Sequence, residues 1–215
     1  MTRLWDISPP MTAASPVFPG DTPFEQRWVA TLGPDCPVNV SALTLSPHTG
    51  AHADAPLHYD PQGCGVGQLD LAPFLGPCRV IHALGVRPLI EWHHLAHALE
   101  KLPPRVLVRT YERMPAHHWD DQMAAFAPST IERLADLGVC LIGIDSASID
   151  PPTSKGLDSH QVIRRREMRV LENLWLDEVD EGDYELIALP LKLMNADASP
   201  VRAVLRRTSM GSMPQ

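Results

Sequence analysis

Prolines divide this chain into short segments, and their spacing limits the elements that it can form. Of its 215 residues, 22 are proline, and most of them stand between apolar runs. Proline fixes its own φ angle and lacks a backbone donor, so it is typical of turns and loops. The intervening runs are short, apolar and rich in β-branched residues, which predicts strands over residues 38–46, 78–84, 105–110, 139–145 and 184–191.

Two helical patterns lie among these strands. Residues 87–102 repeat apolar positions at spacings of three and four, as one face of a helix requires. Residues 127–138 offer Ser129 or Thr130 as the N-cap, and they end at Gly138, a residue typical of helix C-termini. Strand and helix therefore alternate through the middle of the chain, an order that favours an α/β core with some parallel pairing.

The whole chain is expected to form one domain. Its β-rich N-terminal third is expected to wrap the same core, and no linker divides the sequence. Apolar residues make up 44% and charged residues 20%, which is typical of a globular protein. We therefore expect a single domain over residues 1–215, with residues from about 209 to 215 as a mobile tail.

Charge and hydropathy argue against two classes of protein. Lys and Arg total 18 against 26 Asp and Glu, a net charge of -8, whereas a nucleic-acid-binding protein needs a basic face to neutralise phosphates. A membrane-spanning helix needs a run of about 18 apolar residues, and this sequence has none. The N-terminal "MTRLWDISPP" also lacks the apolar segment of a secretory signal. The protein is expected to be cytoplasmic.

The cysteines indicate which ligands a metal site would use. Cys36, Cys64, Cys78 and Cys140 are scattered, without C-x-x-C spacing. In a cytoplasmic chain such cysteines are expected to be reduced and unpaired. A metal site in this protein would therefore be built from histidine and carboxylate side chains.

The stretch "SPHTGAHADAPLHYD", residues 46–60, gathers four metal-capable side chains within eleven positions: His48, His52, Asp54 and His58. Its prolines and glycine break regular structure, so we expect a loop at the end of the predicted strand 38–46, where ligands are often placed. Imidazole and carboxylate suit Zn²⁺ or a similar divalent ion, and three protein ligands leave a coordination position open. Surface histidines in a loop are the alternative, but the complete pattern H-x-G-x-H-x-D-x-P-x-H favours a metal site.

A second candidate patch, within residues 154–176, offers one imidazole and three acids: Asp158, His160, Glu167 and Glu172. An unbroken helix would separate His160 from Glu172 by about 18 Å along its axis, too far for one metal centre. If both are ligands, the helix that begins near Asp158 or Ser159 must end before Glu172. Residues 168–176 would then be extended. From spacing alone, a surface helix with a basic stripe is the more ordinary interpretation.

Two other patterns suggest sites but carry less weight. His93 and His97 in "WHHLAH" have the i, i+4 spacing of zinc ligands on a helix, but the glutamate of H-E-x-x-H is missing. A solvated or packed helix face is the better interpretation. The serine-hydrolase pattern G-x-S-x-G is absent, and "SMGSM" at 209–213 lies in the expected tail.

The whole chain carries a family resemblance. "HTGAHADAPLHYD" resembles the signature H-x-G-T-H-x-D-x-P-x-H of the metal-dependent cyclase-like amidohydrolase family, with Ala51 where many members have threonine. It is similar to the bacterial arylformamidase, or kynurenine formamidase, branch. The resemblance continues in order through "LWDISPP", "FPGDTPF", "PPRVLVRT", "LIGIDSASIDPP", "SK" and "GDYELIALPLKL…DASPVRAVLR".

The resemblance implies a fold, a metal centre and an assembly. The fold would be a compact α/β domain of the cyclase-like, swivelling β/α type, with a mostly β, barrel-like central sheet flanked by helices. His48, His52 and Asp54 would bind one zinc ion, and Asp54 would bridge to a second. His160 would hold the second ion, and Glu172 would be shared. Other divalent ions such as Mn²⁺ would also suit two such sites, and members are homodimers.

The resemblance also implies an activity, the hydrolysis of N-formyl-L-kynurenine to L-kynurenine and formate in tryptophan degradation. Metal-bound hydroxide would attack the formyl carbon, and His58 would act as general acid and base. Phe18 falls where relatives commonly carry a substrate-contacting tryptophan, so an aromatic wall is kept without the indole N–H. Two alternatives stay open: hydrolysis of a related small aryl or cyclic amide such as isatin, and a binding module with structural zinc.

Overall fold

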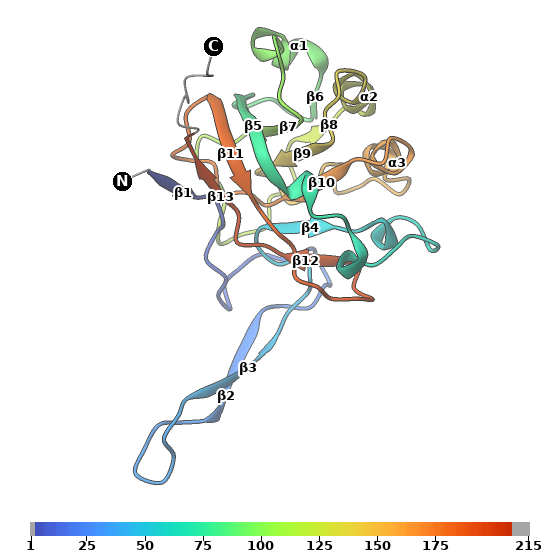
Figure 1. Cartoon of the computed structure of the whole chain (residues 1–215). Helices are drawn as coiled ribbons and strands as arrows, with labels where there is room; N and C mark the ends of the chain where they lie inside the picture. Colours follow the sequence, from blue (N-terminus) through green and yellow to red (C-terminus); the bar gives the residue numbers. More distant parts are fainter. Residues whose placement is uncertain (1–2, 208–215) are drawn as a thin grey trace, which may run out of the picture.

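The central feature of the fold is one strongly curled sheet. The computed structural model describes residues 3–207, so the expected tail at 209–215, including "SMGSM", lies outside the described residues. Within that range, nine strands follow the order β1-β13-β11-β5-β7-β9-β10-β4-β12 (Figure 1). They are β1 Leu4–Asp6, β4 His52–Asp54, β5 Leu75–His82, β7 Arg105–Arg109, β9 Leu141–Ile144, β10 Arg169–Glu172, β11 Gly182–Ile187, β12 Ala198–Pro200 and β13 Val204–Arg206. The barrel-like sheet with flanking helices confirms the expected α/β class.

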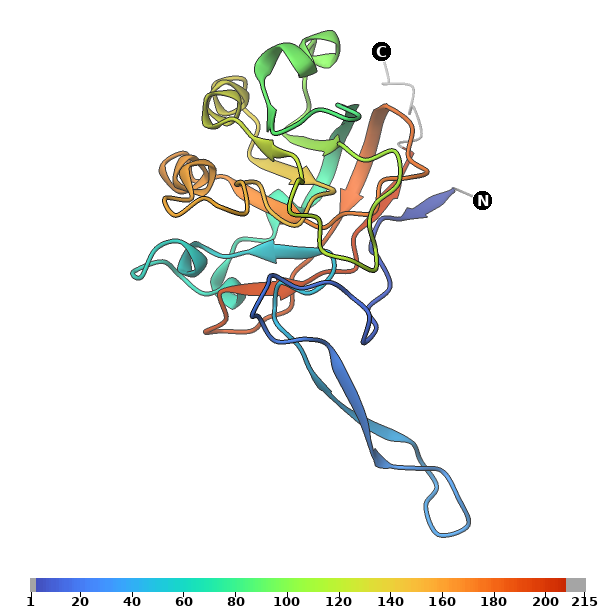
Figure 2. The same ribbon diagram turned by 180° about the vertical axis from the view of Figure 1, so that it is seen from behind.

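The middle of the sheet is parallel and its flanks are antiparallel. β5, β7, β9 and β10 pair in parallel, whereas β4 runs antiparallel to both β10 and β12. Parallel neighbours need crossover connections, which here carry α1 (Trp92–Leu95), α2 (Pro128–Asp136) and α3 (Asp158–Arg165). Figure 2 shows these helices stacked along one side of the molecule.

The central strands bury side chains on both faces. In β7, Val106 and Val108 pack with Ile131 of α2 in one core cluster, whereas Leu107 joins Phe74 in a second cluster on the opposite face. Successive side chains of a strand point to opposite faces, so a strand covered on both sides becomes a continuous apolar run. This explains why the sequence predicted these strands so readily.

One of the two predicted helices is wrong. Residues 87–102 contain strand β6 (Leu89–Ile90), paired with β8 (Ala125–Phe126), and then the one-turn helix α1. Ile90 and Leu95 are both fully buried. Apolar spacing that fits one helix face therefore also serves a short strand followed by a helical turn.

The helix predicted over residues 127–138 and the one considered from Asp158 or Ser159 are both present, as α2 and α3. α2 begins after Ala127, with Pro128 in its first turn, so the N-cap prediction of Ser129 or Thr130 is wrong. Gly138 has φ +85° just after the helix, the left-handed conformation expected there. α3 begins at Asp158 and ends at Arg165, before β10, so the helix does end ahead of Glu172 as a shared site requires.

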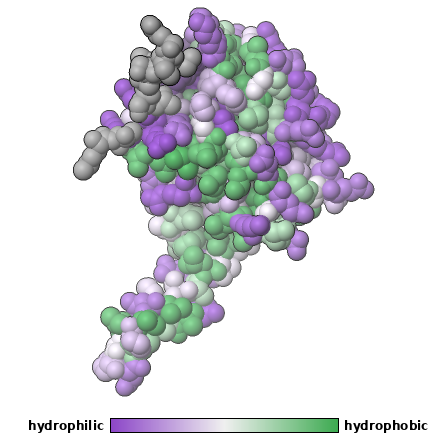
Figure 3. Space-filling model, in the orientation of Figure 1, coloured by the Kyte–Doolittle hydropathy of each residue, from purple (hydrophilic) through white to green (hydrophobic). Residues whose placement is uncertain are grey.

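A hairpin arm extends away from the body. It consists of β2 (Glu25–Ala30) and β3 (Val40–Thr44), which pair only with each other in the described part of the chain (Figures 1 and 2). The predicted strand 38–46 therefore exists, but this part of the N-terminal third does not wrap the core. Large apolar side chains of the two strands and their connecting loop are exposed: Trp28, Val29, Leu32, Val38, Val40 and Leu43. Figure 3 shows hydrophobic surface on this arm.

Single 3₁₀ turns span Pro56–His58, Val66–Gln68, Ala72–Phe74 and Ala96–Ala98. All four cysteines are free, as predicted. Among residues 3–207, no helix has the length and apolar character needed to cross a bilayer.

Candidate metal centre

Strand pairing brings the two candidate patches together. β4 lies between β10 and β12, and its register sets His52 opposite Glu172 and Asp54 opposite Ala198. Residues directly opposite on neighbouring strands project to the same face of a sheet. Ala53, between the two ligand candidates, points the other way into the apolar core. Within the stretch expected to be a loop, residues 52–54 therefore form a short buried strand, and His52, Asp54 and Glu172 share the face toward α3.

The five predicted metal ligands meet in one cluster. His160, in the first turn of α3, places Nε2 3.2 Å from Asp54 Oδ2 and 3.5 Å from Glu172 Oε1. His52 Nε2 lies 3.2 Å from Glu172 Oε2 and 3.4 Å from Asp54 Oδ1. His48 approaches the carboxylate of Asp54 with Nδ1 rather than Nε2, at 3.1 Å from Oδ1. Three imidazoles thus surround two carboxylates.

The polar atoms inside the cluster fit a cation. His52 Nε2 and Asp54 Oδ1 are buried and form no hydrogen bond with any group of the described residues. A buried polar atom without a partner is costly, and a cation between two atoms that face one another in this way would satisfy both. Nitrogen and carboxylate oxygen suit Zn²⁺ and similar divalent ions. The residues present therefore fit the metal that the resemblance implies.

Outer hydrogen bonds orient each imidazole. His52 Nδ1 lies 2.9 Å from the carbonyl oxygen of Gly50, His160 Nδ1 lies 2.7 Å from Asp150 Oδ2, and His48 Nε2 lies 3.0 Å from Asp197 Oδ2. Holding one ring nitrogen of a histidine fixes which nitrogen can face a metal. Each histidine thus has a ring nitrogen directed toward the centre and an acceptor behind it.

Asp150 is a supporting residue that sequence reasoning missed. Its carboxylate accepts hydrogen bonds from the backbone N–H groups of Ser159 and His160, at 2.9 and 3.0 Å. The same carboxylate contacts the His160 ring. Asp150 therefore both anchors the start of α3 and orients the His160 side chain. The neighbouring Ile149 N–H donates to Glu172 Oε1 at 2.7 Å. The signal was the acid in "LIGIDSASIDPP", a segment read only as part of the resemblance.

The electrostatics of the cluster couple imidazolium to carboxylate. Burial opposes a charge on His48, but contacts with Asp54 and Asp197 prevail and raise its pKa to about 9. Burial likewise opposes a charge on His160, yet Asp150 and Asp54 raise its pKa to about 10. Burial also disfavours the Asp54 carboxylate, but the neighbouring His160 and His48 hold its pKa well below the usual value. Metal ligation needs neutral imidazoles, so a cation would displace protons from this cluster.

His58 lies at the rim of the centre. It ends the 3₁₀ turn Pro56–His58, and its side chain is 31% exposed, against 1% for those of His52 and His160. Its ring centroid is 4.4 Å from that of His48 and 5.7 Å from that of His160. His58 is thus close to the ligand candidates but open to solvent, a position from which a proton can be exchanged.

Phe18 stands apart from the ligand cluster. It is 54% exposed and packs edge-on against Trp119, with ring centroids 5.3 Å apart. Trp119 borders a small cavity together with Asn173, the residue after Glu172. The sequence offered no signal for Trp119, because its partner is brought to it only by the fold.

The histidines of "WHHLAH" lie elsewhere. The His93 side chain is 70% exposed, and His97 is paired with Glu181 at 2.8 Å. Both belong to the α1 region rather than to the centre. Their interpretation as a solvated helical face is consistent with these positions.

Comparison with known proteins defines the class of this chain. A sequence profile of the family described as "Putative cyclase" matches residues 5–151, and the chain belongs to this family. Its fold is similar to that of a predicted metal-dependent hydrolase from Bacillus stearothermophilus, with a TM-score of 0.82, 25% identity and coverage of 97% of this chain and 100% of the other. Isatin hydrolase A from Labrenzia aggregata shares the fold at a TM-score of 0.82 and 20% identity, over 97% and 94% of the two chains.

The relatives with the higher identities identify the branch of the family. The kynurenine formamidase of Delftia acidovorans is 74% identical over 204 residues, which cover 95% of this chain and 97% of that protein. The kynurenine formamidase of Paracidovorax citrulli is 72% identical over 207 residues, which cover 94% and 96%. Within the family, the chain therefore groups with the kynurenine formamidases, a branch of hydrolases.

Proposed function

We propose that this protein is a zinc-dependent arylformamidase that hydrolyses N-formyl-L-kynurenine to L-kynurenine and formate. The observation that carries the proposal is the pair of buried atoms without partners, His52 Nε2 and Asp54 Oδ1, inside a ring of imidazoles and carboxylates. The names of the relatives in Delftia acidovorans and Paracidovorax citrulli supply the substrate.

Each of the two central carboxylates faces different histidines with its two oxygens, an arrangement that two bound ions would explain. Asp54 directs Oδ1 toward His48 and His52 but Oδ2 toward His160. Glu172 directs Oε2 toward His52 but Oε1 toward His160. A carboxylate that faces two groups of ligand candidates would suit a centre that holds two cations. We assign His48, His52 and Asp54 to the first ion and His160 to the second, with Asp54 and Glu172 shared.

Proton transfer is the task left to the chain itself. When bound, zinc makes a water molecule acidic enough to supply a nucleophile near neutral pH, and it polarises the formyl oxygen. The C–N bond breaks toward an arylamine, and departure of the amine as an anion would be costly, so its nitrogen must gain a proton. His58 lies at the open rim and is of the residue type that changes charge near neutral pH. We assign His58 as the general acid and base.

Phe18 is assigned to substrate binding. Its ring and that of Trp119 meet edge-to-face beside the cavity that Asn173 also lines. The exposed ring of Phe18, backed by the half-buried ring of Trp119, suits the anthraniloyl ring of formylkynurenine. The proposed role is an apolar wall for that ring rather than a hydrogen bond.

We also propose that the protein is a homodimer whose hairpin arm binds the second copy. Gln26 pairs with Leu43 and Trp28 with Ser41, so Trp28 and Leu43 lie on the same face of the arm, both more than half exposed. A two-stranded hairpin alone is marginally stable in water, and such an apolar patch indicates an interaction surface. The body has a groove of about 1510 Å³ whose lining includes Trp5, Met11 and Leu191 beside charged residues such as Arg113 and Asp177.

Metal analysis combined with a hydrolysis assay tests the proposed function. We expect two zinc ions per chain and turnover of N-formylkynurenine that a chelator abolishes and added zinc restores, with the circular dichroism spectrum unchanged. Loss of the folded spectrum with the chelator would point instead to structural zinc. Faster hydrolysis of isatin than of formylkynurenine would identify the cyclic amide as the substrate.

A further inference from the structure

The carboxylate of Asp197 contacts both the ligand cluster and the rim histidine, His58. Asp197 directly precedes β12, and its carbonyl oxygen accepts a hydrogen bond of 2.8 Å from the backbone N–H of Ala55. Ala55 follows the ligand candidate Asp54 in the chain. The backbone at residue 197 is therefore fixed relative to the strand that carries the centre.

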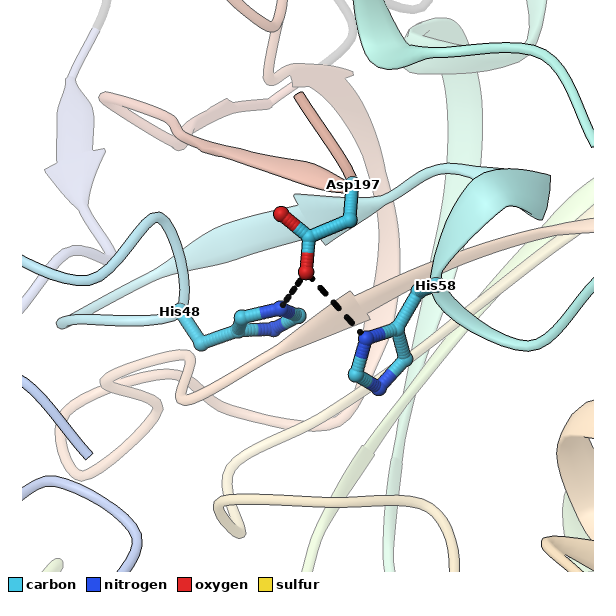
Figure 4. Close-up of side chains that lie close together, drawn as sticks. All are labelled: His48, His58 and Asp197. Carbon is cyan, nitrogen blue, oxygen red and sulfur yellow. Dashed lines mark hydrogen bonds and ion pairs between the residues drawn. The ribbon is translucent and has the colours of Figure 1, made fainter. Parts of the chain in front are cut away.

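One carboxylate oxygen of Asp197 faces two histidine rings. Oδ2 lies 3.0 Å from His48 Nε2 and 3.5 Å from His58 Nδ1, and Figure 4 shows the two rings on either side of it. A single carboxylate oxygen is therefore within reach of both rings.

The contact decides which nitrogen of His58 is available. An Nδ1–H that points at a carboxylate leaves Nε2 as the nitrogen that exchanges protons. In Figure 4 the second ring nitrogen of His58 points away from Asp197. The same geometry, a carboxylate behind an imidazole, orients the histidine of serine-hydrolase triads. In His48 the two ring nitrogens exchange these roles. Nε2 contacts the Asp197 carboxylate, and Nδ1 faces Asp54.

We propose that Asp197 is a positioning residue that orients His58 for proton transfer and His48 for metal binding. The inference rests on the proposed function for His58, but its His48 half depends only on the metal centre. Asp197 touches neither Asp54 nor Glu172 in the contacts of the cluster, so it acts through the two rings. One residue then links the group that moves the proton to the group that binds the metal.

A double-mutant cycle tests the link to His58. With zinc saturating, Asp197→Asn should lower kcat about 10–100-fold, the usual cost of an outer partner, with KM changed less than about twofold. In the His58→Ala background the same substitution should change kcat less than about twofold, because the residue through which it acts is gone. Equal losses in both backgrounds would overturn the inference for His58. Asp183→Asn, which removes an exposed carboxylate that binds Arg79, is the matched control.

Two measurements need no turnover. Titration of metal-free protein with zinc should show affinity about 10–100-fold weaker in Asp197→Asn than in Asp183→Asn, and unchanged affinity would overturn the inference for His48. The ¹⁵N chemical shifts of the His58 ring should report an Nδ1–H tautomer in the parent protein and a mixture in Asp197→Asn. If the parent protein hydrolysed no formylkynurenine, the proposed function would fail while these two measurements still decided the role of Asp197.

Discussion

The candidate metal centre and the hairpin arm both depart from the usual distribution of polarity. The centre buries polar side chains, whereas the arm exposes apolar ones. In the centre, imidazoles and carboxylates are buried, and two of their atoms lack partners within residues 3–207. In the arm, tryptophan, valine and leucine are exposed on two strands that contact little of the body. Scattered apolar groups on a surface need no explanation, but unpaired buried polar atoms and a continuous apolar patch do. In the proposals made above, a cation would satisfy the first region and a second copy of the chain would cover the second.

The largest expected effect tests the centre as a cation site. Glu172→Ala should reduce bound zinc below one ion per chain and lower turnover by more than about 10⁴-fold, because a shared ligand is lost together with several kcal/mol of transition-state stabilisation. Metal analysis and kinetics on the same sample measure both. Glu172→Gln should keep an oxygen for the Ile149 N–H and hence the melting temperature, but not the metal. Full occupancy of both ions in either variant would show that Glu172 is not shared.

The next effect distinguishes the role of His58, at the rim of the centre, from that of the buried ligand candidates. His58→Ala should keep both zinc ions and lose about 10²–10⁴-fold in turnover, the typical contribution of an acid–base group. Its side chain is part-exposed, whereas the ligand candidates His52 and His160 are buried. His93→Ala, at an exposed histidine outside the centre, serves as the control. A metal-free His58→Ala protein would make His58 a ligand and reverse the assignment.

The third effect tests the arm. Replacing Trp28 and Leu43 with glutamate should weaken the dimer by about 10³-fold, because two central apolar anchors contribute about 2 kcal/mol or more each. Sedimentation velocity across a concentration series gives the dissociation constant. Leu137→Glu changes an equally exposed leucine at the end of α2 and should leave the dimer intact. A monomeric parent protein would refute the proposed assembly.

The sequence predicted the central strands and the ligand types, because both depend on local patterns. Val106, Leu107 and Val108 read as a strand since both faces are buried. The 48–58 stretch stood out because ligand residues are adjacent in the chain. Helix 87–102 could not be resolved, since Ile90 and Leu95 are buried in either arrangement.

Long-range pairing is what sequence spacing did not show. The register of β4 against β10 sets His52 opposite Glu172, and nothing local encodes that register. The fold gives three further residues their partners. Asp150 contacts His160, ten positions away, and Asp197 contacts His48, 149 positions away. Trp119 packs against Phe18. Only the family resemblance linked residues 154–176 to residues 46–60. Asp150 and Asp197 were missed because no sequence spacing relates them to the histidines that they contact.

The smallest expected effect comes from a buried carboxylate whose hydrogen bonds all lie within the protein. Asp145 accepts hydrogen bonds from the Thr110 N–H and hydroxyl and from the Tyr111 N–H, yet burial raises its pKa from 3.8 to about 6. A raised carboxyl pKa means that the native state holds the proton longer, so stability from this group is full below pH 3.8 and declines as the pH rises through about 6. Between pH 5 and 7 the free energy of unfolding of the parent should fall by about 1 kcal/mol relative to Asp145→Asn, measured by urea unfolding. Unlike the centre, this site should show no response to zinc or chelator. A parallel pH dependence in the two proteins would mean that Asp145 is ionised throughout, and that internal donors alone can hold a buried charge without a cation.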